Sequence, residues 1–352
     1  MQRSKVILGD LHQKLNSKEY LDILFDQVIP VCGNFPEKMD LVILGDIYDG
    51  KAIIRSEIQN CFSDFLLRIS DYFEKIYLLV GNHDLENLQK KETSLNVFKR
   101  FHDKVVVIDR PVAVEEILMC PYIHDQNEFK QTIDSYCSSG MIKYLFLHQG
   151  FNGFEYREGI VCDDAVEINI LPPEAKIVFS GHFHKPQQLG NFIYVGSCWS
   201  QSFGEANQQK RFFVLTKDGG IEEHNISGLP RHLIFNLEVE SQEEFQSELT
   251  NISKDIKEED IVKLSITAPK ETVDKVGSVI LPGGLEGRVS LQVQFFLKED
   301  KPEILIDDSL NPIDMLYQYI DLNKEQFKNI DTKKIKLLGK KYLQSCEGVE
   351  GA

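Results

Sequence analysis

LVILGDIYD, residues 41–49, is a short apolar run that ends in two acidic side chains, Asp46 and Asp49. Each run of this kind is rich in Val, Ile, Leu and aromatic residues, which predicts a buried strand. Open α/β folds place their ligands beyond the carboxyl ends of the strands, so we expect the polar tips to meet at one edge of a sheet. Four further runs share the design: VILGDLH (6–12), LLVGNHD (78–84), YLFLHQG (144–150) and IVFSGHFH (177–184).

The polar tips carry side chains that suit metal ions. Imidazole and carboxylate together suit manganese, iron or zinc better than calcium, and no thiolate motif contributes. Two cations about 3.5–4 Å apart can activate a hydroxide and clamp a phosphate. A single Gly-Asp turn or a lone histidine is common without any metal, but five such tips in order predict a two-metal hydrolase. The motif residues are Asp10, His12, Asp46, Asp49, Asn82, His83, Asp84, His148, His182 and His184.

Length and composition predict a soluble globular chain with more than one domain. The chain has 352 residues, 42% hydrophobic and 27% charged. No apolar run is long enough to span a bilayer, and residues 1–5 lead straight into a strand, which leaves no room for a signal peptide. The seven cysteines are scattered and form no Cys-x-x-Cys pair, which favours reduced thiols in a cytoplasmic protein.

The net charge limits how the chain can bind nucleic acid. A formal net charge of −16 argues against wrapping nucleic acid by bulk electrostatics. Local binding of nucleic acid is still possible at the expected metal site. Among the carboxylates and imidazoles expected to hold metal, Asp10 and Asp46 carry the negative charge, two charges in all. Two divalent cations would outweigh them and give a positive focus that attracts a phosphodiester.

Residues 1–228 alternate strands with amphipathic helices. Apolar residues recur at helical spacing over 21–28 after a cap at Ser17, again over 54–73, and around 128–136. The region closes with RFFVLTKDGGIEEHNI (211–226), two strands around an Asp-Gly turn. This order predicts a mixed α/β fold, a two-sheet sandwich flanked by helices.

The pattern restarts after residue 228. Residues 229–298 run strand, helix, strand, helix, strand, which predicts a small α+β domain. Residues 299–312 are charged and contain prolines, as in a linker. Residues 313–352 predict two amphipathic helices, whose apolar stripes would dock either on the chain itself or on a partner helix.

The motifs GDLH, GDIYD, GNHD, a lone His148 after a strand, and GHFH resemble the calcineurin-like metallophosphoesterase superfamily in type, order and context. Within it the chain is most similar to the SbcD-type DNA repair nucleases, above all the short phage version that partners an SbcC-like ATPase. GHFHKPQQLGNFIYVGSCWSQSFGE (181–205) and KRFFVL (210–215) extend the resemblance, which is strong over 1–215 and looser beyond.

The resemblance implies a role for each motif residue. His83 would protonate or stabilise the leaving group, and Asp84 would orient His83 or a ligand. Asp49 stands where some relatives carry a second histidine that contacts the substrate, which leaves its role open. The ligands of one metal would be Asp10, His12 and His184, those of the other Asn82, His148 and His182, with Asp46 bridging.

Four residues outside the metal motifs are candidate substrate contacts. Lys51 and Arg55 follow the second motif and could touch DNA phosphates, or form the solvated face of the next helix. Asn152 belongs to a glycine-containing loop after His148 that could approach the substrate. Trp199 could stack on a base, although core packing explains a lone tryptophan equally well.

The resemblance implies a DNA nuclease subunit that uses two divalent cations, manganese first, with magnesium also compatible. It would be a 3′→5′ exonuclease on duplex ends and an endonuclease on single strands, in the host cytoplasm if phage-encoded. An SbcC-like coiled-coil ATPase would bind the C-terminal helices, and the segment 53–73 would serve a homodimer. The alternatives are a phosphatase or phosphodiesterase for nucleotides or other small phosphoesters, and a noncatalytic scaffold.

Overall fold

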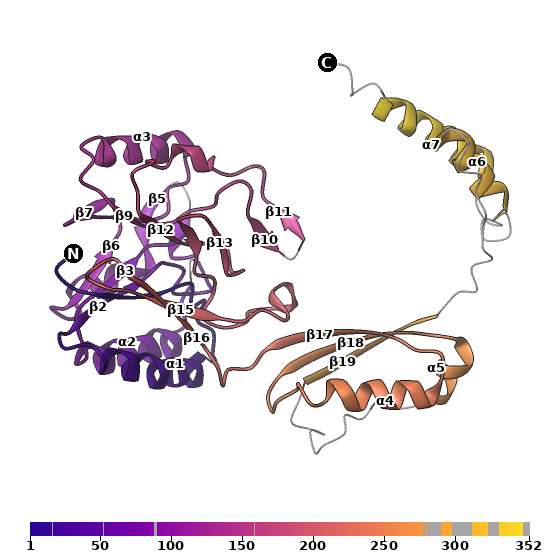
Figure 1. The fold of residues 1–352 in the computed structure, drawn as a ribbon, viewed down its shortest axis with the longest axis horizontal. Coiled ribbons are helices and arrows are strands. Elements are labelled where there is room, and N and C mark those ends of the chain that lie inside the picture. The colour runs from indigo at the N-terminus through magenta and orange to yellow at the C-terminus, as the bar shows by residue number, and fades with distance from the viewer. Residues whose placement is uncertain are drawn as a thin grey trace.

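The computed structural model confirms the predicted mixed α/β sandwich (Figure 1). It describes residues 1–15, 17–51, 53–87, 90–157, 159–276, 279, 290–297, 312–322 and 331–347. The linker predicted at 299–312 lies outside these ranges, apart from its last residue. Within them, no helix has both the length and the apolar character that crossing a membrane requires.

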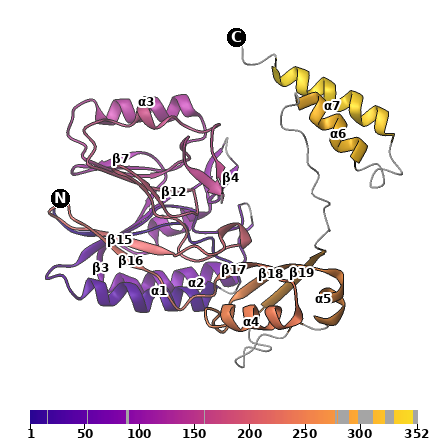
Figure 2. The same cartoon turned by 45° about the vertical axis from the view of Figure 1, so that its right-hand side comes forward.

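The first sheet has six strands in the order β16-β15-β1-β2-β3-β6. Strands β1, β2, β3 and β6 are parallel, whereas β15 runs antiparallel to both β1 and β16. Helices α1 and α2 cover the outer face (Figure 2). The elements are β1 (Lys5–Leu8), α1 (Ser17–Cys32), β2 (Met39–Ile43), α2 (Ser56–Ser70), β3 (Phe73–Leu79), β6 (Val105–Ile108), β15 (Arg211–Leu215) and β16 (Ile221–Asn225).

The second sheet also has six strands, in the order β13-β14-β12-β9-β8-β7. Its four central strands are parallel, and helix α3 packs on its outer face. The side chain of Asp125 caps α3 by accepting from the N–H groups of Asn127 and Glu128. The elements are β7 (Val112–Val114), β8 (Ile117–Cys120), α3 (Gln126–Cys137), β9 (Tyr144–His148), β12 (Ile177–Gly181), β13 (Gln187–Leu189) and β14 (Phe192–Tyr194).

Side-chain alternation along the strands builds three apolar layers. Val6 and Leu8 of β1 point outward into a cluster with α1 and α2, while Ile7 points inward. The inward cluster joins the two sheets, for example through Phe146 and Phe179. The parallel strands are therefore apolar on both faces, which explains why each motif follows a continuous hydrophobic run.

One predicted helix end is wrong. The apolar spacing over 54–73 predicts a helix up to Phe73, but α2 ends at Ser70 and Phe73 begins β3. Phe73 is fully buried in the same cluster as the inner face of α2, so periodicity alone does not separate the two elements.

Shorter elements line the edges of the sandwich. Two small hairpins pair β4 with β5 and β10 with β11. The bounds are β4 (Leu85–Asn87), β5 (Lys90–Thr93), β10 (Glu155–Arg157), β11 (Ile160–Val161) and the 3₁₀ helices η1 (Ser94–Arg100), η2 (Ile168–Ile170) and η3 (Phe203–Glu205).

A three-stranded parallel sheet, β17-β18-β19, follows the sandwich and has an apolar cluster of its own. Phe245 and Leu249 of α4 pack there against alternate residues of β18. The elements are β17 (His232–Glu238), α4 (Gln242–Ile252), β18 (Ile261–Ala268), α5 (Lys270–Val276) and β19 (Ser290–Leu297).

Two further helices, α6 (Pro312–Leu322) and α7 (Thr332–Glu347), pack on each other. Gly339 of α7 lies against Leu316 of α6, where a Cβ would collide with the leucine side chain. Lys336 and Asp321 form an ion pair of 2.6 Å between the two helices. Leu337 and Leu338 of α7 remain 55% and 58% exposed.

A buried ion pair at the start of the first sheet gives a stability prediction. Lys5 Nζ lies 2.7 Å from Asp40 Oδ2, and the two side chains are 2% and 4% exposed. Asp40→Ala should lower the free energy of unfolding by about 3–5 kcal/mol, because it leaves a buried ammonium without its partner. Urea denaturation followed by circular dichroism measures this loss.

The matched control is Asp109→Ala, which removes the carboxylate of a partly exposed pair with Lys99 at 2.6 Å. That change should cost below about 1 kcal/mol. Equal losses for the two variants would contradict the importance assigned to the buried pair.

Candidate metal centre

The five motifs come together from two sheets. Asp10, Asp46 and Asn82 follow β1, β2 and β3 of the first sheet, whereas His148 ends β9 and His182 follows β12 of the second. The prediction of a single sheet edge is therefore wrong in this detail. Strands buried on both faces look alike in either sheet, so the sequence pattern does not assign a strand to its sheet.

The first ligand group consists of Asp10, His12 and His184. Each offers one ligand atom, and these atoms lie within 4.8 Å of one another. His184 Nε2 is 2.9 Å from His12 Nε2 and 3.8 Å from Asp10 Oδ2. Asp10 and His12 are buried, so their ligand atoms are shielded from bulk solvent.

The second ligand group consists of Asp46, His148 and His182, again within 4.8 Å. Asn82 Oδ1 joins it, at 2.7 Å from His182 Nδ1 and 3.1 Å from His148 Nε2. Asp46 faces both groups, because its Oδ1 lies 3.4 Å from His148 Nε2 and its Oδ2 lies 3.4 Å from His12 Nε2. One carboxylate thus spans the two groups.

Hydrogen bonds on the far side of two rings fix which nitrogen faces the centre. His148 Nδ1 donates to the main-chain oxygen of Leu44 at 2.7 Å. His184 Nδ1 donates to Glu205 Oε1 at 2.7 Å. In both rings Nε2 is then the nitrogen that points inward and whose lone pair could bind a metal.

The backbone at three proposed ligands adopts the left-handed region. Among the described residues, six that are not glycine have positive φ, and His12 (44°), Asp46 (47°) and His182 (90°) are three of them. Such conformations cost about 1–3 kcal/mol each and persist where the surrounding structure holds them. Their concentration here marks the motif loops as the functional part of the fold.

Two glycines allow these loops to approach each other. A Cβ on Gly81 would collide with the Asp46 carboxylate and main-chain nitrogen, and one on Gly181 would collide with Asp10. The glycine before each of these two motif tips is therefore required by close contact with a carboxylate, which follows the adjacent strand for Gly81 and a strand of the other sheet for Gly181.

The charges at the centre are strongly coupled. Burial by itself would raise the pKa of Asp46, but the imidazoles of His148 and His12 hold it well below its usual range. Burial would lower the pKa of His148, yet Asp46 and Asp10 raise it to about 9. Burial together with His148 lowers the pKa of His182 to about 3. The buried carboxylates of Asp46 and Asp10 are thus stabilised by positive charge nearby.

These residues fit a pair of divalent cations. Asp10, His12 and His184 would hold one ion, and Asn82, His148 and His182 the other, with Asp46 between them. The donor set of imidazole, carboxylate and amide oxygen suits manganese, iron or zinc. A cation would satisfy Asp46 and Asp10 and replace the proton that they induce on His148.

His83 lies beside the centre and is held by Asp49. Its Nδ1 donates to the main-chain oxygen of Asp49 at 2.9 Å, and its ring meets the ring of His12 edge to face at 4.6 Å. The Asp49 carboxylate lies 3.6 Å from His12 Nδ1 and 3.5 Å from Lys14 Nζ. One ligand atom each of His12, Asp46 and His83 also lie within 4.8 Å of one another, so His83 borders both groups.

Asp84 lies behind the motif loops and bonds to their backbone. It is fully buried, and its carboxylate accepts from the main-chain N–H groups of Ile47 (3.0 Å), Tyr48 (3.3 Å) and Gly81 (2.9 Å). The residue that touches the His83 ring nitrogen is Asp49, through its backbone. Asp84 therefore joins the loop after β2 to the loop after β3, next to the proposed ligands Asp46 and Asn82. Of the two expected roles, this arrangement agrees with orienting a ligand.

Two contributors were missed by motif reasoning. Glu205 contacts the ligand His184 but stands 21 positions later, outside the five metal motifs. Tyr122, just after β8, stacks on His182 with ring centroids 5.7 Å apart. Its position after another strand of the second sheet was the available signal.

The four candidate substrate contacts differ in burial and in their hydrogen bonds. Trp199 is 2% exposed and packs against Tyr20 in the core, so stacking on a base does not fit its burial. Asn152 has both ends of its amide bonded within its own loop, to Ala165 and Glu167. Lys51 and Arg55 are exposed, and Arg55 pairs with Glu57 at 3.2 Å.

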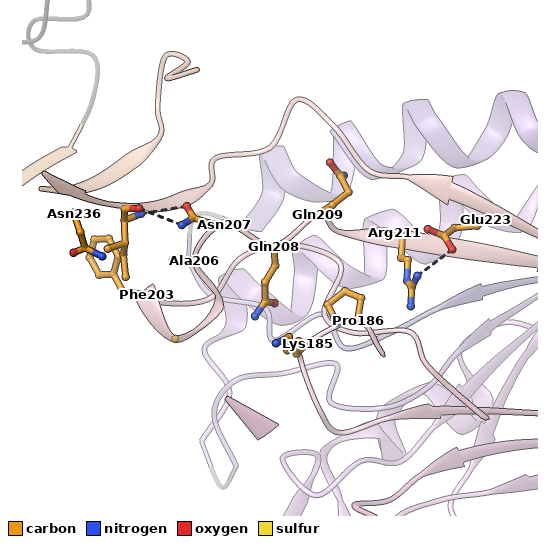
Figure 3. Close-up of a pocket in the computed structure, with 12 residues that line it drawn as sticks. Lys185, Pro186, Phe203, Ala206, Asn207, Gln208, Gln209, Arg211, Glu223 and Asn236 are labelled. Atoms are coloured by element: carbon orange, nitrogen blue, oxygen red, sulfur yellow. Dashed lines mark hydrogen bonds and ion pairs between the residues drawn. The ribbon is translucent and has the colours of Figure 1, made fainter. Parts of the chain in front are cut away.

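A cavity of about 640 Å³ opens next to the GHFH segment. Lys185, Pro186 and Gln208 are among the residues that line it (Figure 3). Asn207 closes one end by hydrogen bonding to Ile234 of β17. The cavity thus lies between the sandwich and the first strand of the small sheet.

Residues 5–186 match the family model of the calcineurin-like phosphoesterases. Exonuclease subunit 1 of Enterobacteria phage T4 is 25% identical over 177 residues, 49% of this chain and 51% of that protein, so the match spans about half of the relative. The DNA double-strand break repair protein Mre11 of Methanococcus maripaludis is 22% identical over 263 residues, 66% of this chain and 67% of that protein. Protein 244L of Invertebrate iridescent virus 6, provisionally named a phosphoesterase, is 25% identical over 263 residues, 68% of this chain and 87% of that protein.

The close approach at Gly81 predicts a metal-binding defect. Gly81→Ala should weaken Mn²⁺ binding roughly 10–100-fold, because the added methyl group displaces the Asp46 carboxylate that faces both ligand groups. Isothermal titration calorimetry measures the affinity. Gly33→Ala, whose Cβ would meet only Pro30 O at 3.4 Å, is the control and should bind like wild type. Unchanged binding by Gly81→Ala would remove Asp46 from the proposed ligands.

Proposed function

Because the chain belongs to the calcineurin-like phosphoesterase family, we propose that it is a two-metal-dependent DNA nuclease subunit of an SbcCD-type recombination or repair complex. It acts as a 3′→5′ exonuclease on double-stranded ends and as an endonuclease on single strands. The observation that carries the proposal is the pair of ligand groups that share Asp46, with His83 alongside. The names of two relatives, an exonuclease subunit and a double-strand break repair protein, support DNA as the substrate.

Two divalent cations, Mn²⁺ first and Mg²⁺ as an alternative, would supply a hydroxide nucleophile and neutralise the nonbridging oxygens of the phosphate. The chain contributes a rigid frame for this chemistry. Asp46 is fixed by the N–H of His83, which donates to its Oδ1 at 2.8 Å, and Asp10 by the N–H of His182 at 3.0 Å. Ligands fixed before the substrate arrives need no rearrangement during the reaction.

His83 is suited to assist the leaving group. The carbonyl of Asp49 accepts the hydrogen of Nδ1, so Nε2 is the nitrogen left for the substrate. Burial lowers the pKa of His83, although Asp46 opposes this. We assign His83 as the general acid on its position beside both ligand groups, because the protonated ring would donate from Nε2 to the leaving alkoxide.

The DNA contacts of this proposal lie outside the metal ligands. Lys51 and Arg55 are exposed on the segment after Asp49 and can offer charge to DNA phosphates. The cavity between the sandwich and β17 borders Lys185, the residue after the ligand His184. The small sheet therefore stands where it can contact DNA that enters the centre, which supports a capping role for residues 229–298.

Partners are part of the same proposal. The exposed leucines of the α6–α7 pair are suited to an apolar groove on an SbcC-like coiled-coil ATPase. A homodimer through α2 is supported by Leu67 and Tyr72, which are exposed apolar residues on and just after that helix. The relative from phage T4 agrees with action in a host cytoplasm.

One observation favours a second function, hydrolysis of nucleotides or other small phosphoesters. The relative provisionally named a phosphoesterase aligns over 68% of this chain, more than the exonuclease subunit does at 49%. The same metal core serves both chemistries, so the substrate decides between them.

Removal of His83 tests the assigned chemistry. His83→Ala should reduce Mn²⁺-dependent shortening of end-labelled duplex DNA roughly 10²–10⁴-fold, because the leaving alkoxide loses its proton donor. The variant should still bind two Mn²⁺ ions by calorimetry, and EDTA should abolish cleavage by the wild-type chain.

His102→Ala is the control, since His102 pairs with Asp103 at 3.0 Å outside the motifs. Loss of one Mn²⁺ ion in His83→Ala would instead make His83 a ligand. Cleavage of bis-p-nitrophenyl phosphate with DNA untouched, even with a candidate SbcC-like ATPase present, would favour the small-substrate function.

The exposed leucines of α7 test the partner. Leu337→Glu/Leu338→Glu should abolish co-purification with an SbcC-like ATPase, because two carboxylates would be buried against an apolar groove. Hydrolysis of bis-p-nitrophenyl phosphate should be unchanged. Lys333→Glu on the same helix is the control for charge alone. Undiminished co-purification of the double variant would exclude α7 as the contact.

A further inference from the structure

We propose that Glu205, held in place by Lys210, is a positioning residue that keeps the imidazole proton of His184 on Nδ1. It thereby determines the affinity of one of the two metal positions. This inference rests on the proposed function, since it assigns a role to residues next to that centre. It is supported by a buried hydrogen-bond network behind His184, formed by Glu205, Lys210 and Ser197, which all lie outside the metal motifs.

Glu205 and Lys210 are both buried, with 6% of each residue exposed. Glu205 Oε1 accepts from His184 Nδ1 at 2.7 Å, and its Oε2 accepts from Lys210 Nζ at 2.6 Å and from Ser197 Oγ at 2.7 Å. The N–H of Gln201 also donates to Oε2 at 3.3 Å, so both oxygens are engaged and the carboxylate cannot turn away from the imidazole without losing these bonds. A buried charge pair of this kind is costly to break, which gives it a fixed geometry.

Lys210 also holds the main chain of the ligand. Its Nζ lies 3.1 Å from the main-chain oxygen of His184 and 2.8 Å from Ser197 Oγ. The same ammonium therefore fixes the backbone of His184 and the carboxylate that fixes its ring. The position and the rotation of the imidazole are both determined by one network.

The two metal groups differ in this respect. His148 is oriented by a neutral main-chain carbonyl, that of Leu44, whereas His184 is oriented by a carboxylate. A hydrogen bond to a charged acceptor is stronger and makes the imidazole a better electron donor at its other nitrogen. We therefore expect the position formed by Asp10, His12 and His184 to depend on Glu205, and the other position to be independent of it.

The amide of Glu205→Gln cannot satisfy both neighbours. If its oxygen faces His184, its N–H₂ group faces the ammonium of Lys210. If its oxygen faces Lys210, its N–H₂ group faces Nδ1 of His184 and forces the proton onto Nε2, which removes the ligand lone pair. Adding Lys210→Met removes the conflict, because the amide can then accept from His184 and donate to Ser197 Oγ.

The experiment is Mn²⁺ titration by calorimetry of the full chain, without substrate. Glu205→Gln should weaken one of the two Mn²⁺ positions roughly 10–100-fold and leave the other unchanged. Glu205→Gln/Lys210→Met should recover part of that loss, since the main-chain oxygen of His184 loses Lys210 but keeps the N–H of Ser197 at 3.2 Å. Glu223→Gln, at an exposed carboxylate that pairs with Arg211 at 3.0 Å, is the matched control and should bind as wild type.

Wild-type binding by Glu205→Gln at both positions would overturn the inference, and so would a double variant that binds no better than Glu205→Gln alone. If Glu205→Gln does not fold, Ser197→Ala, which removes one bond to Glu205, should weaken the same position severalfold, and no change would be the contrary result. Since metal binding is measured without DNA, a failure of the proposed nuclease function leaves this test intact.

Discussion

The Asp46 carboxylate is the point on which the centre depends. Its two oxygens face two separate groups of imidazoles, and it is buried where water cannot satisfy it. The unusual features nearby follow from placing it there. Its own backbone is left-handed, Gly81 gives it room, and Asp84 ties its loop to the neighbouring one. A buried anion that faces two ligand groups is stable when positive charge is supplied on both sides.

Much of this arrangement could be predicted from the sequence, because metal ligands at strand ends leave a local signal. A short apolar run followed by Asp, Asn or His is visible without any knowledge of the partners, and the strands after which the motifs come are as expected. What the local signal lacks is information on pairing. It does not tell that β9 and β12 belong to a different sheet from β1, β2 and β3, nor that Phe73 starts a strand that packs under α2.

The residues that support the ligands are harder to predict. Asp84 lies within a metal motif yet bonds to backbone, and Asp49 holds His83 through its main chain, which any residue could supply. Glu205 acts from a segment whose composition gives no sign of it. Such partners are selected by three-dimensional proximity, so they become visible once the loop from Gly196 to Lys210 is folded against β1 and the GHFH segment. Trp199 lies in the same loop and is buried in the core because the loop folds against the first sheet.

The strand order also determines when the first sheet and the metal centre can form during synthesis. Strand β1 leaves the ribosome well before one of its two neighbours, β15, which follows about two hundred residues later, with Lys5 opposite Leu215. Until then one edge of β1 has no partner, and for most of that interval His184 and Glu205 are also absent. Contacts of such long sequence separation slow folding and leave apolar strands open to aggregation. The nascent chain therefore passes through a stage at which the early motifs exist without a centre, and a ribosome-bound chain ending before β15 has no complete first sheet.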